Sequence, residues 1–353
     1  MIIKKIFSLV ASIINLFIII LYFISSSSAQ ENNSKYYSKD EGILSIMYHR
    51  FEENKYPSTN IRIEVFKQHL GIIKNSKFEF YHPKDFENNF DKPKKRKKIL
   101  LTIDDAFESF YEKAWPILKK DKIPFLLFVS TEPVGKNGYM TWSQIKEIEK
   151  SGFGVIGHHS HSHGYLIDKK YEEFVLDIEK ANKIFVNKIG YIPSLFSYPF
   201  GEYSREMSEY ISKNFSISFG QHSGVIDINK ERFELPRFPI NEKYGELKRF
   251  NSIINYFPLE YKRLKPIEKK LNNKENPPQF SVEFFKEQKN INNITCYSNE
   301  GNKWRETNIN LEKNYLKVFF SEKFSFRRGR INCSLNDKEG WRWFGIQFTI
   351  DQL

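Results

Sequence analysis

The sequence is poor in cysteine, and it contains no internal repeat. Only two of its 353 residues are cysteines, so one disulfide is the most that the chain can form within itself. No solenoid-type period is present, and no nucleic-acid-binding motif accompanies the formal charge of +12. These absences exclude a repeat array and argue against a nucleic-acid partner, while 40% hydrophobic residues indicate a globular chain.

The one long apolar run lies at the N-terminus. Two lysines precede the run at residues 6–24, and small residues follow it up to Ala29. This pattern predicts a signal peptide over residues 1–29, which is cleaved to leave Gln30 as the first residue. The run is nearly long enough to span a bilayer, so an uncleaved membrane anchor is the alternative. In either case we expect the rest of the chain to be exported to the periplasm or cell envelope.

The number and placement of the cysteines are consistent with export. Cys296 and Cys333 both lie in strand-like segments near the C-terminus. An oxidising compartment would join them, so we predict one disulfide; two buried free thiols are the alternative.

A dense basic run, KPKKRKK at residues 92–98, directly precedes the apolar run ILLTI. We interpret it as a solvated loop that leads into a strand. The alternative is a surface that attracts an anionic partner, such as a phosphate-rich envelope or an acidic polymer.

Composition and periodicity divide the chain after the N-terminal segment. A polar linker at 30–42 precedes a region at 43–264 in which strand-like and helical stretches alternate, as in a parallel α/β sheet or barrel. A charged segment rich in proline and asparagine at 265–278 is predicted to be a second linker. Short β-rich runs at 279–353 predict a small all-β sandwich-like domain.

Polar groups follow several strands of the α/β region. Asp104 and Asp105 follow ILLTI, the cluster GHHSHSH occupies 157–163, and SYPFGEYS occupies 197–204. The carboxyl ends of parallel strands meet at one edge, so these groups should converge. An isolated aspartate pair would be read as a turn or a helix cap. With the histidines nearby, a metal that balances the buried charges is the better interpretation.

Spacing narrows the choice of histidines without settling it. His159 and His163 are four apart and share a face where a loop turns into a helix, whereas in an extended segment His161 would share that face as well. One aspartate and two histidines leave positions open on a divalent ion, as in a hydrolytic site. Surface histidines without a ligand are the alternative.

The motifs TIDDAF, HSHSH and SYPFGEYS, in this order and spacing, resemble those of the polysaccharide deacetylases of the NodB-homology type, carbohydrate esterase family 4. The resemblance covers roughly residues 43–250. It implies an α/β fold, a distorted (β/α) barrel of the NodB-homology type, and hydrolysis of N-acetyl groups on a polysaccharide with one divalent metal ion, usually zinc.

The resemblance also implies roles for single residues. Asp104 matches the catalytic base, and Asp105 matches a metal ligand. His159 and His163 match the two histidine ligands. The third motif supplies a backbone amide for the oxyanion, near Tyr198 and Phe200 here.

The chain departs from the family pattern at two motif positions. Ala106 replaces the usual glycine after the aspartate pair, and Ser197 replaces the arginine that opens the third motif. In the subgroup with a YPFG motif, a later arginine contacts the base instead, and Arg237 in LPRFP matches it.

The usual C-terminal histidine that serves as general acid is absent. His49 in MYHR is the candidate for this role, because extracellular poly-N-acetylglucosamine deacetylases, which look similar here, supply the acid from an N-terminal MYH strand. His222 is the competitor. We interpret His69 and His82 as structural.

Three tryptophans of the C-terminal region invite two interpretations. Trp304, Trp341 and Trp343 could be stacking platforms for a glycan, or they could belong to the sandwich core; we favour the core.

The sequence thus predicts an exported, metal-dependent hydrolase that removes N-acetyl groups from an N-acetylglucosamine-containing envelope or extracellular polysaccharide. A non-catalytic carbohydrate-binding relative and a metal-dependent O-acetyl esterase are the alternatives. The N-acetylated polysaccharide is the one partner expected, apart from a membrane if the N-terminal segment is retained.

Overall fold

The structure is a computed structural model that describes residues 40–351. The predicted signal peptide or anchor and most of the first linker lie outside the described residues. Between residues 40 and 351, none of the helices combines the length and apolarity needed to cross a membrane.

A parallel sheet forms the centre of the first part of the chain. Its strands lie in the order β10-β1-β5-β6-β7-β8-β9, and each neighbouring pair is parallel. Strands β1, β5 and β6 are buried almost throughout, as expected for a parallel sheet that is covered on both faces. The strands are β1 (Ile43–Tyr48), β5 (Lys98–Ile103), β6 (Phe125–Val129), β7 (Gly154–His158), β8 (Leu195–Ser197), β9 (Ile217–Phe219) and β10 (Phe238–Pro239), with β4 (Glu79–Phe80) beside β5.

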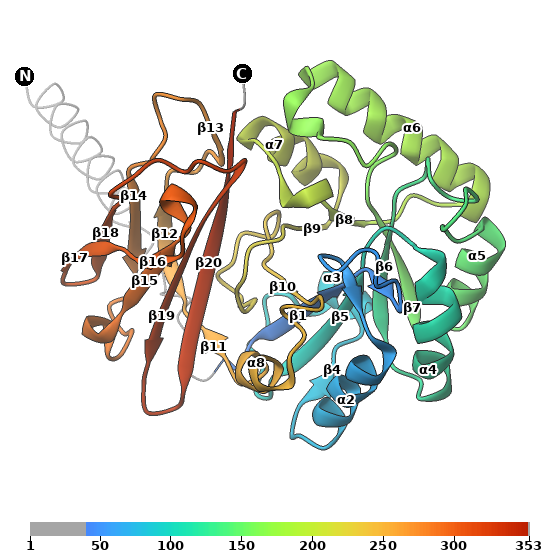
Figure 1. Ribbon diagram of the computed structural model, residues 1–353, viewed down its shortest axis with the longest axis horizontal. Helices are drawn as coiled ribbons and strands as arrows, with labels where there is room; N and C mark the ends of the chain where they lie inside the picture. The colour runs from blue at the N-terminus through green and yellow to red at the C-terminus, as the bar shows by residue number, and fades with distance from the viewer. Residues whose placement is uncertain (1–39, 352–353) are drawn as a thin grey trace, which may run out of the picture. The chain divides into compact units, whose positions relative to one another are not determined.

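Helices cover this sheet on its outer side, where α4, α5 and α6 follow one another around strands β5 to β7 (Figure 1). Their apolar residues meet those of the strands in one large buried cluster. The predicted distorted (β/α) barrel is therefore confirmed. The helices are α2 (Ile63–Lys74), α3 (Phe86–Asn89), α4 (Trp115–Lys120), α5 (Trp142–Lys150), α6 (Tyr171–Ile189), α7 (Arg205–Asn214) and α8 (Leu247–Ile253), and a small parallel pair joins β2 (Arg50–Phe51) to β3 (Asn60–Ile61).

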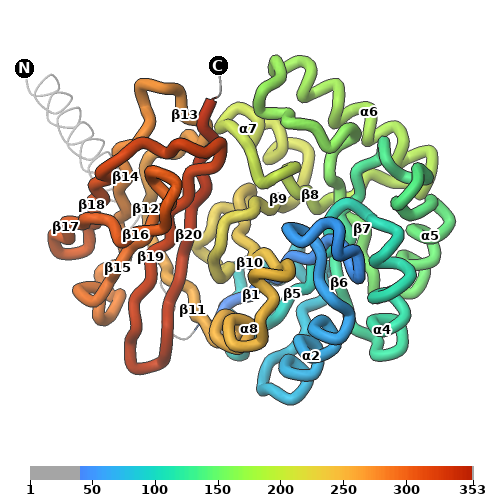
Figure 2. The backbone as a smooth tube through the Cα atoms, viewed as in Figure 1, coloured from blue at the N-terminus to red at the C-terminus, as the bar shows by residue number. Residues whose placement is uncertain are grey.

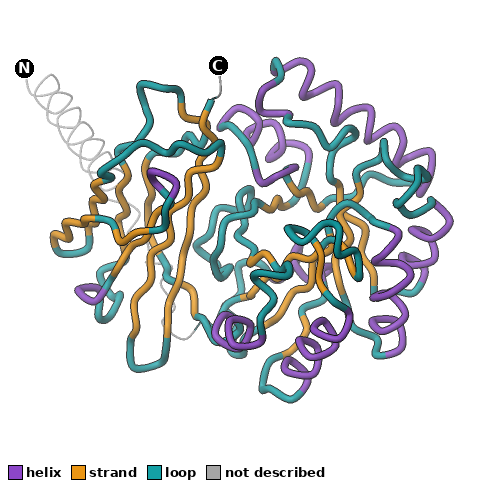
Figure 3. Tube along the Cα trace, in the orientation of Figure 1, coloured by secondary structure: helices purple, strands orange, loops and turns teal. Residues whose placement is uncertain are grey.

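The C-terminal part is built mainly from strands (Figure 3). Two sheets, in the orders β11-β20-β19-β15-β16 and β12-β14-β18-β17, enclose a separate apolar cluster. Cys296 and Cys333 lie opposite each other on β15 and β19 and form the predicted disulfide. The strands are β11 (Phe257–Pro258), β12 (Tyr261–Lys265), β13 (Lys270–Leu271), β14 (Phe280–Phe284), β15 (Thr295–Ser298), β16 (Arg305–Glu306), β17 (Asn308–Glu312), β18 (Tyr315–Phe319), β19 (Arg328–Asn336) and β20 (Trp341–Ile350).

The segment at 265–278 is not the open linker that its composition predicts. Its strand β13 pairs with the far end of β20, and β11 pairs with the near end, so β20 runs beside both segments (Figure 2). Proline and charged residues are tolerated there because these strands are short and lie at the sheet edge. The chain therefore enters the C-terminal sheets at residue 257, before the predicted boundary.

The basic run at 92–98 also differs from the expected solvated loop. Lys94 and Lys97 are buried, and their ammonium groups donate to backbone carbonyls, including that of Tyr256. Burial lowers the pKa of Lys97 to about 7. The run is therefore partly built into the fold and does not present all its charges to an anionic partner.

Candidate functional site

Three predicted ligands meet at the carboxyl edge of the sheet. Asp105 follows β5, whereas His159 and His163 lie in the loop after β7. One ligand atom from each lies within 4.8 Å of the others. Asp105 Oδ1 is 3.0 Å from His163 Nε2 and 3.5 Å from His159 Nε2. This is a donor set that suits a divalent ion such as zinc.

The hydrogen bonding of His159 supports a cation between these groups. Its Nδ1 is 2.7 Å from the backbone oxygen of Ser197, which can only accept, so Nδ1 carries the proton. Nε2 then presents a lone pair, is buried, and has no hydrogen-bond partner among the described residues. A lone pair that faces the Asp105 carboxylate is repelled unless a cation lies between them. Burial lowers the pKa of His159 to about 4, which keeps the ring neutral and able to bind a metal.

Asp104 is held by an arginine from a distant segment. The Arg237 guanidinium donates to both carboxylate oxygens of Asp104, at 2.6 and 2.9 Å, and both side chains are fully buried. It also donates to the hydroxyls of Thr102 and Ser197. Burial is the largest single influence on Asp104 and opposes its ionisation, but the charge and hydrogen bonds of Arg237 together with the nearby histidines outweigh it, so the pKa of the carboxyl is lowered. Ser197, the residue that replaces the family's usual arginine, thus orients both Arg237 and His159.

The two candidates for the general acid lie in different surroundings. His49 follows β1, and its Nε2 is 3.9 Å from Asp104 Oδ2. It lines the same cleft as the metal-ligand group. His222 is buried, and the charges of Glu234 and Lys269 act on it. His222 does not line the cleft, so the structure brings His49 and not His222 to the site.

The remaining histidines make contacts that explain their presence. His158 packs among the rings of Phe185, Phe196 and Phe215, away from the ligand group. His161 turns toward Thr131, with 2.8 Å from its Nδ1 to the hydroxyl. Neither contributes to the cluster of possible metal ligands.

The two histidines outside the cluster are also engaged elsewhere. His69 is buried between Tyr48 and the backbone of Gly245, and its ring stacks on Phe250 at 3.8 Å. His82 contacts the backbone of Gly152. Both have the structural surroundings that the sequence suggested.

The backbone is strained around the ligand group. Asp105, Ala106, His163 and Phe200 have φ values of 74°, 55°, 52° and 59°. Non-glycine residues pay about 1–2 kcal/mol for this left-handed conformation. Ala106 adopts it at the position where the family usually has glycine. The surrounding structure therefore stabilises a turn that aims the Asp105 side chain at the histidines.

The SYPFGEYS turn is held by contacts with both the barrel and the C-terminal strands. The backbone N–H of Tyr198 donates to Phe219, at 3.0 Å, and its side chain is buried against Tyr203. Tyr198 is therefore engaged in the core, whereas Phe200 lines the cleft. The side-chain amide of Gln347 on β20 donates to the backbone oxygens of Phe200 and Gly201, at 3.1 Å each. Sequence reasoning missed Gln347, because no local pattern links residues so far apart.

A cleft of about 710 Å³ opens above the ligand group. The first part of the chain contributes His49, Asp105 and His163 to it. The C-terminal part contributes Trp304, Arg328, Arg330, Asn332 and Trp343.

The surroundings of the three tryptophans therefore differ from those expected of residues in the sandwich core, which was the favoured interpretation. Trp343 stacks on Tyr256, with 5.3 Å between ring centroids, and Trp304 is 49% exposed. Trp341 is 48% exposed. The outward face of β20 packs on the barrel and borders the cleft, a contact that strand alternation alone does not reveal.

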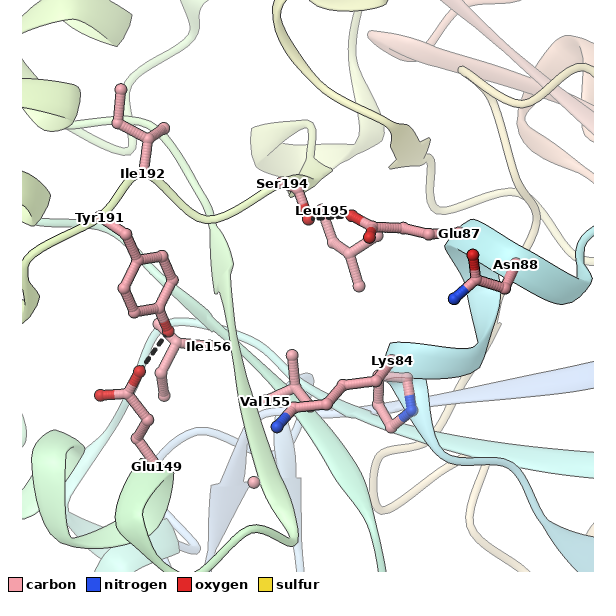
Figure 4. Close-up of a pocket in the computed structure, with 12 residues that line it drawn as sticks. Lys84, Glu87, Asn88, Glu149, Val155, Ile156, Tyr191, Ile192, Ser194 and Leu195 are labelled. Atoms are coloured by element: carbon pink, nitrogen blue, oxygen red, sulfur yellow. Dashed lines mark hydrogen bonds between the residues drawn. The ribbon is translucent and has the colours of Figure 1, made fainter.

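A second pocket lies at the opposite end of strands β7 and β8 (Figure 4). Its acidic groups are already engaged, because Tyr191 donates to Glu149 and Ser194 donates to Glu87. It contains none of the predicted site residues.

Comparison with known proteins agrees with this geometry. A sequence profile of the polysaccharide deacetylase family matches residues 91–215. The Bacillus subtilis polysaccharide deacetylase-type protein YxkH is 25% identical over 166 residues, which are 46% of this chain and 57% of that protein; the chain thus spans little more than half of that relative.

Two further relatives are matched over more of their length. The poly-beta-1,6-N-acetyl-D-glucosamine N-deacetylase of Staphylococcus aureus is 22% identical over 233 residues, covering 58% of this chain and 80% of that enzyme. The structure of IcaB from Ammonifex degensii superposes with a TM-score of 0.53 and 25% identity, covering 61% of this chain and 97% of IcaB. The motifs, the barrel and these matches together make residues 91–215 and the surrounding barrel similar to polysaccharide deacetylases.

Proposed function

We propose that this protein removes N-acetyl groups from an N-acetylglucosamine-containing polysaccharide outside the cytoplasm, releasing acetate. The observation that carries the proposal is the buried group of Asp105, His159 and His163 beside the Asp104–Arg237 pair. The similarity to a poly-N-acetylglucosamine deacetylase supports this choice of sugar. Export to the periplasm or envelope rests on the predicted signal peptide or anchor at residues 1–29.

The cofactor in this proposal is one divalent ion, most simply zinc, held by Asp105, His159 and His163. Such an ion supplies Lewis acidity for the acetamide carbonyl and acidifies a water molecule. The orphaned Nε2 of His159 and the carboxylate that it faces are the features of the site that fit the ion.

The protein's own residues then move the protons. Asp104 accepts a proton from the attacking water, and Arg237 keeps this carboxylate ionised and correctly oriented. The water oxygen forms a C–O bond to the acetamide carbon, negative charge develops on the carbonyl oxygen, and the C–N bond then breaks as His49 protonates the departing amine. The backbone N–H of Phe200 is the donor that we assign to the oxyanion. Acetate and a free amino sugar are the products.

In this proposal, the barrel at residues 43–256 carries the chemistry, and the β-rich region that starts at residue 257 borders the glycan. The stacked Trp343 and the exposed Trp304 are the residues that would contact sugar rings.

The test is acetate release by the zinc-loaded protein from N-acetylglucosamine oligomers, with metal content measured on the same sample. We expect about one ion per chain, and Asp105→Ala should lose both the ion and the activity. His49→Ala should keep the ion but lower kcat by about 10²–10⁴-fold, the range for a lost general acid. His82→Ala is the matched control, because His82 is only partly buried and its hydrogen bonds go to backbone groups alone.

Other outcomes would contradict the proposal in different ways. Release from O-acetyl sugars but not from acetamides would indicate an esterase. Binding of glycan and metal without any release would indicate a non-catalytic relative. Absence of a stoichiometric ion would refute the ligand set.

A further inference from the structure

The cleft carries an excess of positive charge. Four cationic side chains line it, whereas Asp105 is the one carboxylate among its described lining residues. Asp105 is already assigned to the metal. The cations are Lys243, Arg249, Arg328 and Arg330.

Two of these cations differ in how well they are neutralised. Arg328 donates through Nε to Glu202 Oε1 at 2.7 Å, although Glu202 is shared with Arg327. Arg330 donates through Nε to the neutral amide of Gln347, at 3.0 Å. No acidic side chain within the described residues forms an ion pair with Arg330. Its guanidinium therefore keeps both terminal amino groups for a ligand.

The surroundings of Arg330 make an unpaired charge costly. Burial and the neighbouring charge of Arg328 both lower its pKa. Arg328 and Arg330 are two residues apart on β19, so their side chains share the face that borders the cleft. A half-buried cation with a like charge beside it is stabilised when an anion binds between them.

The remaining cations border the same space from the barrel side. Arg249 donates to backbone oxygens of Pro239 and Tyr244, and Lys243 lies beside the Tyr244 ring. Neither has an ion-pair partner among the described residues. Each wall of the cleft thus presents at least one cation that forms no ion pair with any described residue: Arg330 on one side, and Lys243 and Arg249 on the other.

These charges lie close to the proposed reaction centre. The Arg328 guanidinium carbon is 5.2 Å from the centroid of the Phe200 ring. The Phe200 ring is in turn 4.7 Å from that of His163. A sugar whose acetamide reaches the metal ligands would therefore place its neighbours beside the arginines.

Building on the proposed function, we propose that the cleft selects an acidic glycan. Its substrate is an N-acetylated polysaccharide that bears carboxylate or phosphate groups near the target acetamide, and Arg330 and Lys243 are the residues that recognise them. Both anions accept paired hydrogen bonds from a guanidinium. A neutral glycan would bury these cations without a counter-charge.

The experiment compares three N-acetylglucosamine oligomers of equal length: a neutral one, one with lactyl ether carboxylates on alternate sugars, and one with phosphate monoesters at O6. The zinc-loaded full chain is assayed for acetate release, and kcat/KM is measured for each oligomer. The variants are Arg330→Gln and Lys243→Gln. Lys317→Gln is the control, because it removes one charge from β18 outside the cleft.

We expect at least one acidic oligomer to be preferred over the neutral one by about tenfold or more, the size of one or two charge-assisted hydrogen bonds. Whichever acidic oligomer is preferred identifies the anion. Each cleft variant should reduce this preference severalfold, and Lys317→Gln should retain it. Added salt should weaken only the preferred substrate. Arg330→Gln removes the hydrogen bond to Gln347 as well as a positive charge. Lys243→Gln is therefore included as a second cleft variant that leaves this hydrogen bond in place.

Equal kcat/KM values for all three oligomers would overturn the proposal. So would a loss that is the same for neutral and acidic oligomers in both cleft variants, since that would indicate a purely structural role. If the wild type released acetate from none of them, the proposed function would fail. Binding of the three oligomers to the zinc-loaded wild type would then decide the charge selection separately: tighter acidic binding that Arg330→Gln removes would support it, and equal binding would refute it.

Discussion

The pair of Arg237 and Asp104 provides a demanding test of the site. Replacing either partner alone should destabilise the protein strongly, whereas replacing both together should cost much less than the sum of the two single changes. Arg237 donates five hydrogen bonds, two of them to Asp104, and no part of either side chain reaches solvent. Replacing Arg237 by Met leaves the Asp104 carboxylate buried without its counter-charge. We expect this change to lower the free energy of unfolding by about 3–5 kcal/mol.

Asp104→Leu should lower the free energy of unfolding by a similar amount, because it leaves the Arg237 guanidinium buried without its counter-charge. The double variant removes both charges and replaces them with apolar groups, so its cost should be well below the sum of the two. We expect a coupling energy of at least about 2 kcal/mol. Urea unfolding in the presence of a chelator measures it, because the metal-free proteins separate this pair from the effects of any bound ion.

An exposed pair serves as the control for this cycle. Arg305 and Glu322 are 2.7 Å apart but are 34% and 51% exposed, so their coupling should stay below about 1 kcal/mol. Losses at Arg237 and Asp104 that add within about 0.5 kcal/mol would show that the two side chains are independent. The assignment of Arg237 as the residue that holds the base would then be wrong.

Three further predictions concern stability. His69 is buried, and burial lowers its pKa from 6.5 to about 4, so between these pH values the unfolded chain binds more protons than the folded one. Stability should therefore fall by at most about 3 kcal/mol as the pH drops from 6.5 to 4. His69→Gln should reduce this pH dependence in acid denaturation curves. Lys97→Met should raise the melting temperature at pH 7 and below, because burial disfavours the charged form, and the gain should vanish as pH approaches 10.5; an equal gain at every pH would contradict this cause. The double variant Cys296→Ser/Cys333→Ser should lower the free energy of unfolding by about 3–4 kcal/mol, since the disulfide closes a loop with a sequence separation of 37. Equal urea midpoints for the oxidised and the reduced wild type would refute this prediction.

Much of the barrel and its edge could be predicted because the signal is local. Each strand is a short apolar run, and the polar residues that follow it in sequence also follow it in space. Asp105, His159 and His163 come together for this reason. The contact between Arg237 and Asp104 came from the family resemblance, since nothing in the spacing of these residues predicts it.

The remaining features depend on packing between segments that are distant in sequence. Lys97 belongs to a run that is typical of solvated loops, yet it is buried under the backbone of Tyr256. The alternation of β20 indicates that Trp341 and Trp343 share a face, but not that the barrel lies against it. The R-G-R pattern of β19 was the available signal for Arg328 and Arg330, because it places two cations on one face of a strand whose opposite face is buried.

The hydrogen bonds from Gln347 to the Phe200 turn impose an order in time on the assembly of the cleft. A chain synthesised from its N-terminus contains all the barrel strands and all three proposed metal ligands before β20 is available. The turn that carries Phe200 receives its last two hydrogen bonds only when the strand at Trp341–Ile350 has paired. The cleft is therefore completed last, after the segments that carry the three proposed metal ligands have been made.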